Sequence, residues 1–165
     1  MYGIQVDAVY HLLVHNKLLL AWKTGMGKST VFHVASVMRR GVILMVWPLL
    51  ALMTDQFRKA RQLKSPFGRI FCYNIDQIKG AQQINNLVCD LCSLGKDTTD
   101  TYFIFASPQT IPKYSQVLGV LMRRDMIRLI AFDEYHFISV YGRGFRPEVN
   151  NLKHRLFLPY LSVSI

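Results

Sequence analysis

The chain has 165 residues, of which 51% are hydrophobic. That length and composition suit one domain, residues 1–165, with a sizeable core, and they exclude a disordered chain. Twenty Lys and Arg against ten Asp and Glu leave a formal net charge of +10. This excess favours a polyanionic partner, nucleic acid before an anionic membrane surface, although a solubilising basic surface would account for the charge equally well.

The cysteines are few and odd in number: Cys72, Cys89 and Cys92. A secreted disulfide framework is therefore not indicated. Cys89 and Cys92 form a C-x-x-C pair, but a zinc site needs about four ligands and no second pair follows. We expect ordinary buried thiols rather than zinc.

A membrane segment is not predicted. The most apolar run, residues 42–53, is shorter than the roughly 20 residues that span a bilayer, and it contains Pro48. Residues 1–8 lack the basic start and apolar stretch of a signal peptide. We expect an intracellular protein, nuclear if its source is eukaryotic.

Apolar runs alternate with helical segments along the chain. We expect strands at 18–21, 42–47, 69–73, 102–106 and 129–132, and helices at 28–39, 50–64 and 76–94. Nearly continuous apolar strands separated by helices predict an α/β fold, in which a mostly parallel sheet carries helices on both faces.

A glycine-containing loop lies between the first expected strand and the first expected helix. It reads Thr24-Gly25-Met26-Gly27-Lys28-Ser29-Thr30. Glycines let the backbone point N–H groups at phosphate oxygens, and the helix start adds partial positive charge. Lys28 is expected on the β- and γ-phosphates and Ser29 on Mg²⁺. Trp22 stands where the longer P-loop pattern has its first glycine, and the alternative is a turn with a chance lysine.

Two carboxylates end the fifth expected strand, at Asp133 and Glu134. Asp133 is expected to hold Mg²⁺, and Glu134 to orient and deprotonate the attacking water. Asp-Glu alone often marks only a solvated strand end. Downstream of a phosphate loop, at the carboxyl edge of an open sheet, the pair favours nucleotide chemistry.

Four segments together resemble the RecQ family of superfamily 2 helicases. Asp133 to Glu148 is similar to motif II and its aromatic-rich loop, and Trp47 to Gln56 to motif Ia. Residues 106–109 resemble the following motif, and Gln5 lies where motif 0 has its glutamine. The resemblance covers nearly the whole chain and implies the first RecA-like domain of a P-loop NTPase.

The resemblance also implies roles for the matching positions. Gln5 would hydrogen-bond adenine, and His136 would couple the two sites. The positions implied to contact nucleic acid are Pro48, Leu49, Ser107, Pro108, Tyr141, Phe145 and Arg146. Tyr141 and Phe145 could instead be loop residues folded onto the core. The implied activity is that of an ATP-dependent 3′-to-5′ DNA helicase in recombination or repair, and only the resemblance favours DNA over RNA.

The 165 residues reach the point where the family would show motif III, so we expect this chain to lack the second RecA-like domain. That domain would supply the arginine finger, which contributes roughly 10³–10⁵ in rate. We therefore expect the chain alone to bind ATP, to hydrolyse it weakly or not at all, and not to unwind. An alternative is a non-catalytic nucleic-acid-binding or ATP-sensing remnant. The absence of the usual arginine ahead of Gln5 and the Arg143-Gly144 pair favour this alternative. A small-molecule phosphotransferase would need an acceptor pocket and a lid, and neither is indicated.

Basic residues gather in two places. Arg58, Lys59, Arg61 and Lys64 follow motif Ia, and Arg123, Arg124 and Arg128 precede motif II. Such residues give salt-dependent affinity for phosphates, although a solvated basic face is an equally good interpretation for any one of them.

Overall fold

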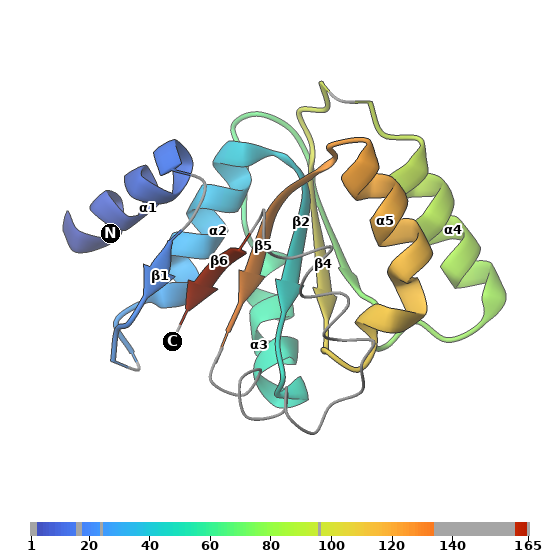
Figure 1. The fold of residues 1–165 in the computed structure, drawn as a ribbon, viewed down its shortest axis with the longest axis horizontal. Helices are drawn as coiled ribbons and strands as arrows, with labels where there is room; N and C mark the ends of the chain where they lie inside the picture. Colours follow the sequence, from blue (N-terminus) through green and yellow to red (C-terminus); the bar gives the residue numbers. More distant parts are fainter. Residues whose placement is uncertain (1–2, 16–17, 24, 96, 134–160, 165) are drawn as a thin grey trace.

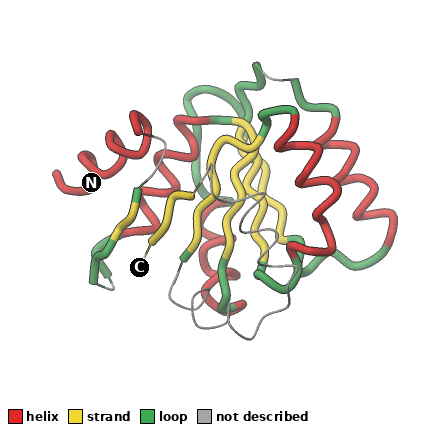
Figure 2. The backbone as a smooth tube through the Cα atoms, in the orientation of Figure 1, coloured by secondary structure: helices red, strands yellow, loops and turns green. Residues whose placement is uncertain are grey.

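The computed structural model describes residues 3–15, 18–23, 25–95, 97–133 and 161–164. Its centre is a six-stranded sheet in the order β1-β6-β5-β2-β4-β3, and every pairing is parallel (Figures 1 and 2). The strands are β1 (Leu19–Leu20), β2 (Gly41–Val46), β3 (Ile70–Asn74), β4 (Thr101–Ala106), β5 (Ile127–Phe132) and β6 (Leu161–Ser164). The predicted α/β class with a parallel sheet is confirmed.

The two central strands are buried from end to end. Every residue of β2 and of β4 is buried, and Val42 pairs with Tyr102 in a register that continues to Val46 and Ala106. Strands covered on both faces need apolar side chains at consecutive positions, which is why these segments are continuous apolar runs in the sequence.

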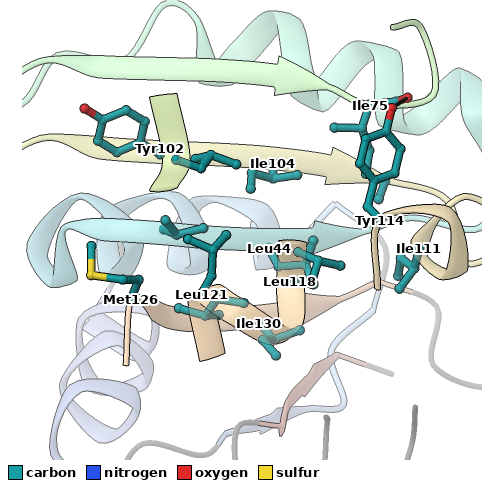
Figure 3. Close-up of a cluster of buried hydrophobic side chains, with 14 of the residues drawn as sticks. Leu44, Ile75, Tyr102, Ile104, Ile111, Tyr114, Leu118, Leu121, Met126 and Ile130 are labelled. Carbon is teal, nitrogen blue, oxygen red and sulfur yellow. Dashed lines mark hydrogen bonds between the residues drawn. The ribbon is translucent and has the colours of Figure 1, made fainter. Parts of the chain in front are cut away.

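Helices cover both faces of the sheet (Figure 1). One face carries α1 (Gly3–His15), α2 (Lys28–Arg39) and α3 (Leu50–Ala60). The other carries α4 (Ala81–Cys92), the 3-10 turn η1 (Ile111–Tyr114) and α5 (Ser115–Arg123). Successive side chains of β2 alternate between the two cores, so Leu44 packs under α5 and Met45 packs under α2 and α3. Figure 3 shows the first of these cores, in which Leu118 and Leu121 lie over Leu44 and Ile130.

Helix boundaries differ from the sequence predictions in two places. The helix expected over 50–64 ends at Ala60, and the one expected over 76–94 begins at Ala81. Gly80, with φ of 97°, precedes α4, and residues 75–77 form a turn in which Ile75 N–H donates to Phe105 O of β4 at 3.0 Å. Among the described residues, none of the helices has the length and apolar character that crossing a bilayer requires.

Candidate nucleotide and nucleic-acid site

The predicted phosphate loop lies between β1 and α2. Gly25 and Gly27 have φ of 88° and 79°, a region that residues with a Cβ rarely adopt. Gly27 is the N-cap of α2, so the first helical residues are Lys28 and Ser29. The loop therefore has the backbone that phosphate binding needs, a left-handed turn at a helix start. Thr24 lies outside the described residues.

Lys28 faces its own loop. Its Nζ donates a hydrogen bond of 2.9 Å to the carbonyl oxygen of Trp22, and the side chain is half-buried. Thr30 N–H donates to Gly27 O at 3.0 Å, which closes the first turn of α2. A triphosphate in this loop would offer Lys28 charged acceptors, and charge-assisted bonds are about twice as strong as those to a neutral carbonyl.

Gln5 packs directly against the loop. Its side chain is 5% exposed, and Nε2 donates a hydrogen bond of 3.0 Å to Met26 O. A Cβ placed on Gly27 would lie 2.2 Å from Gln5 Nε2. Glycine at 27 is thus required by its φ, and a Cβ there would also displace the end of the Gln5 side chain. The adenine contact expected of Gln5 remains a prediction.

Asp133 follows β5 at the same edge of the sheet. Its N–H donates to Val46 O at 3.1 Å, which fixes the residue beside the end of β2. Parallel strands present their carboxyl ends on one edge, so Asp133 and the loop after β1 share that edge. Glu134, His136, Tyr141, Phe145 and Arg146 lie outside the described residues.

The donor atoms at this edge suit a small hard cation with a phosphate. Ser29 is half-buried and offers a hydroxyl, and Asp133 is half-buried and offers a carboxylate. Across the part of the chain that the structure describes, no His, Cys, Asp or Glu side chains gather in threes as a metal cage. Mg²⁺ is usually bound by one or two protein oxygens together with phosphate oxygens and water, so the set fits this ion.

The segment resembling motif Ia follows β2. Pro48 is half-buried, while Leu49 and Leu50 are 45% and 57% exposed at the start of α3. These apolar side chains stand in solvent next to the carboxyl edge. They are therefore accessible to a ligand there, as the nucleic-acid prediction for Pro48 and Leu49 requires.

Ser107 follows β4 and, unlike Leu49, is buried and hydrogen-bonded within the protein. It is 3% exposed, and its hydroxyl donates to Asp76 Oδ1 at 2.5 Å while its N–H donates to Asp76 Oδ2 at 2.8 Å. Thr110 Oγ1 also donates to Asp76 Oδ1, at 2.8 Å. The Ser107 hydroxyl is therefore committed to a protein carboxylate, and the accessible parts of this loop are half-buried Pro108 and exposed Gln109.

Sequence reasoning missed Asp76. The available signal was an acidic residue just after a strand, but its partners are 31 and 34 residues away in the sequence. Without the strand order, nothing placed the end of β3 beside the end of β4.

Several of the basic residues predicted to bind phosphates make contacts within the protein. Asp55 pairs with Arg58 at 2.8 Å and with Lys59 at 2.6 Å on α3. Arg124 donates to Cys92 O and, at 2.9 Å, to Leu94 O, so it caps α4. Arg128 pairs with Asp125 at 3.1 Å. Part of the predicted phosphate-binding charge is thus engaged within the protein. The exposed cations with no ion pair to a described acid include Arg61, Lys64 and Arg123.

Comparison with known proteins now adds to this geometry. The family model for DEAD/DEAH box helicases matches residues 2–164. This chain belongs to the DEAD/DEAH box helicase family. Its family is enzymatic, and the curated relatives are ATP-dependent DNA helicases of the RecQ type, which confirms the resemblance seen in the motifs.

The helicase relatives span plants, animals and bacteria. The chain is 28% identical over 150 residues to ATP-dependent DNA helicase Q-like SIM of Arabidopsis thaliana, covering 91% of this chain and 16% of that protein. It is 29% identical to ATP-dependent DNA helicase RecQ of Synechocystis, covering 90% and 29%. It is 25% identical to ATP-dependent DNA helicase Q5 of Rattus norvegicus, covering 88% and 14%. The chain thus spans less than a third of the length of these relatives.

Solved helicase structures share the fold. The UvsW helicase from bacteriophage T4 superposes with a TM-score of 0.60 at 19% identity, over 99% of this chain and 51% of that one. The restriction-modification enzyme LlaGI, in complex with a DNA substrate mimic, gives 0.64 at 17% identity, over 99% and 16%. These likenesses support the α/β helicase fold alone.

Proposed function

We propose that this chain is the first RecA-like domain of an ATP-dependent 3′-to-5′ DNA helicase of the RecQ type, acting in recombination or repair. One observation carries the proposal: a left-handed glycine turn places Lys28 and Ser29 at the start of α2, on the sheet edge where Asp133 ends β5. ATP supplies phosphoryl-transfer free energy when bound, and Mg²⁺ neutralises the charge of its phosphates.

Each residue of the site has its own role in binding or hydrolysing ATP. Lys28 binds the terminal phosphates, and the loop amides of Gly25 to Lys28 surround the others. Ser29 and Asp133 would hold Mg²⁺, and Glu134 would take a proton from the attacking water. Gln5, against the loop at Met26, reads adenine, and His136 passes the state of this site to the nucleic-acid side.

Single-stranded or branched DNA would cross the same edge of the sheet. Pro48 and Leu49 after β2, and Pro108 after β4, are exposed or half-buried there. The resemblance to the family implies that Tyr141, Phe145 and Arg146 also contact the DNA, since aromatic faces and arginine stack on bases without sequence preference. The net charge of +10 supports a polyanionic ligand.

The 165 residues by themselves should bind ATP and hydrolyse it slowly, without unwinding. Stabilising the transition state in this class needs an arginine from a second RecA-like domain. The test measures the affinity of a fluorescent ATP analogue with Mg²⁺, with and without single-stranded DNA, beside a strand-separation assay. Binding that DNA alters, with no strand separation, is the expected result. Absence of nucleotide binding in the folded chain would instead favour a non-catalytic remnant.

A further inference from the structure

Helix α1 carries apolar side chains on two faces. Ala8, Val9 and Leu12 are buried against α2, with Leu12 fully buried. Yet Val6, Tyr10 and Val14, spaced by four residues, are 51%, 62% and 51% exposed. Because apolar side chains lie on two faces of α1, hydrophobic burial alone only weakly favours the observed rotation of the helix about its axis.

Polar contacts at the two ends of α1 favour the observed rotation of the helix about its axis. At the start of α1, Gln5 Nε2 donates to Met26 O in the phosphate loop. At its end, Arg39 Nη2 donates to Leu12 O at 2.8 Å and to Leu13 O at 3.0 Å. The second contact matters because the last carbonyls of a helix lack partners within it, and a cation there is also favoured by the helix dipole.

The two contacts lie at opposite ends of α2. Met26 lies just before α2, and Arg39 is the last residue of α2. The starts of the two helices meet and their ends meet, so α1 and α2 lie side by side in the same direction. Figure 1 shows α1 at one end of the molecule, and it packs mainly against α2. Among the described elements, α2 is therefore the main determinant of the register of α1.

We infer that Arg39 is a positioning residue for base selectivity, which fixes the rotation and register of α1 and thereby places Gln5 over the phosphate loop. The inference rests on the proposed reading of adenine by Gln5. Arg39 contacts no nucleotide: it lies at the far end of a 12-residue helix from Lys28, about 17 Å along the axis.

The chain contains a matched control. Arg124 caps the end of α4 through the carbonyls of Cys92 and Leu94, as Arg39 caps the end of α1. Helix α4 lies on the opposite face of the sheet and carries no residue of the proposed site. Arg39→Gln and Arg124→Gln therefore remove the same kind of bond, but only the first should alter which nucleotide is bound.

The experiment compares the dissociation constants of Mg-ATP and of inorganic tripolyphosphate with Mg²⁺. The ratio of the two reports recognition of the adenosine part of ATP, to which Gln5 is proposed to contribute, while tripolyphosphate alone reports the loop. In Arg39→Gln the preference for ATP should fall roughly five- to tenfold, as in Gln5→Ala, which is the range that loss of one hydrogen bond gives. Tripolyphosphate affinity should change less than twofold. Arg39→Lys, which keeps a cation and donors, should regain at least half of the preference, and Arg124→Gln should retain all of it.

The contrary outcomes distinguish failure of this inference from failure of the proposed function. A preference retained in Arg39→Gln but lost in Gln5→Ala would overturn the inference and leave the proposed function intact. An equal loss of both ligands would also overturn it, because Arg39 would then act on the loop as a whole. An unchanged preference in Gln5→Ala would refute adenine reading and the inference with it, whereas loss of all binding only in Lys28→Ala would still support the phosphate site. If Arg39→Gln fails to fold, Arg39→Met, which keeps the apolar stem but cannot donate to Leu12 O or Leu13 O, decides by the same ratio: a retained preference would overturn the inference.

Discussion

The ammonium of Lys28 donates a hydrogen bond of 2.9 Å to the carbonyl oxygen of Trp22, six residues earlier in the chain. The bond spans the phosphate loop from its helical end to its strand end. The ammonium has three donors, so a phosphate would share or compete for this contact, and the loop backbone at Trp22 should respond to binding.

That response can be read from the protein's own fluorescence. Of the two tryptophans, Trp22 is half-buried beside the loop, and Trp47 is 4% exposed at the end of β2. We expect Mg-ATP to change the tryptophan emission of the native chain and of Trp47→Phe. The change should be absent in Trp22→Phe. A signal that follows Trp47 instead would place the rearrangement away from the loop.

Half-buried Asp76 should contribute more to the free energy of unfolding than an exposed aspartate does. Removing its carboxylate leaves the amide of Ser107 and the hydroxyl of Thr110 without their acceptor, whereas the Ser107 hydroxyl keeps Thr110 Oγ1 as an acceptor at 3.2 Å; both residues are buried. Unpaired buried donors cost about 1–3 kcal/mol each. Asp76→Ala should therefore lower the free energy of unfolding in urea by about 2–4 kcal/mol. Asp97→Ala, at an exposed loop aspartate, should lower it by less than about 0.5 kcal/mol. Equal effects would contradict the account of the Asp76 cluster.

His33 should make the fold sensitive to mild acid. Burial, and secondarily the charge of Lys59, lower the pKa of His33 to about 4 from 6.5. The unfolded chain then binds more protons than the folded one between these values, so stability is complete above pH 6.5 and falls as pH drops toward 4. The expected loss between pH 7.5 and pH 5 is about 2 kcal/mol.

Urea unfolding at the two pH values measures that loss. His33→Leu removes the titrating ring and should reduce the pH dependence by that amount. An unchanged pH dependence in His33→Leu would show that other groups cause the acid sensitivity.

The three cysteines should react with thiol reagents at very different rates. Burial raises the pKa of the Cys72 thiol to about 11, against a small opposing effect of Arg61. The thiolate is the reactive form, so Cys72 should be nearly inert at pH 8. Cys89 is exposed, and Cys72 and Cys92 are half-buried, so the expectation of buried thiols is wrong at Cys89. Mass spectrometry after brief alkylation should find Cys89 modified first, and Cys89→Ser should abolish the fast phase. Rapid labelling of Cys72 in the folded chain would contradict its burial.

Local signals predicted the sheet and the helix after the phosphate loop. The expected helix over 28–39 is α2, because a glycine turn and a following amphipathic run mark both its start and its buried face. The two strands β2 and β4 begin within one residue of the predicted positions, since their apolar runs are continuous.

Non-local contacts could not be predicted in the same way. Helix α1 was not predicted because its apolar residues surround it, and Arg39, which holds its end, lies 27 residues from Leu12. Asp76 was missed because its partners follow a different strand. These contacts depend on which elements become neighbours in space.

The central claim is that the loop before α2 binds the triphosphate of ATP through Lys28. The most direct test is the affinity of Mg-ATP for the native chain, Lys28→Ala and Lys23→Ala, each shown to be folded. Lys23 lies in the same loop but is exposed, so it controls for a change of one positive charge. The account predicts loss of at least tenfold in affinity for Lys28→Ala and less than threefold for Lys23→Ala, since a charged hydrogen bond contributes about 1.5–3 kcal/mol. Equal losses, or unchanged binding in Lys28→Ala, would contradict it.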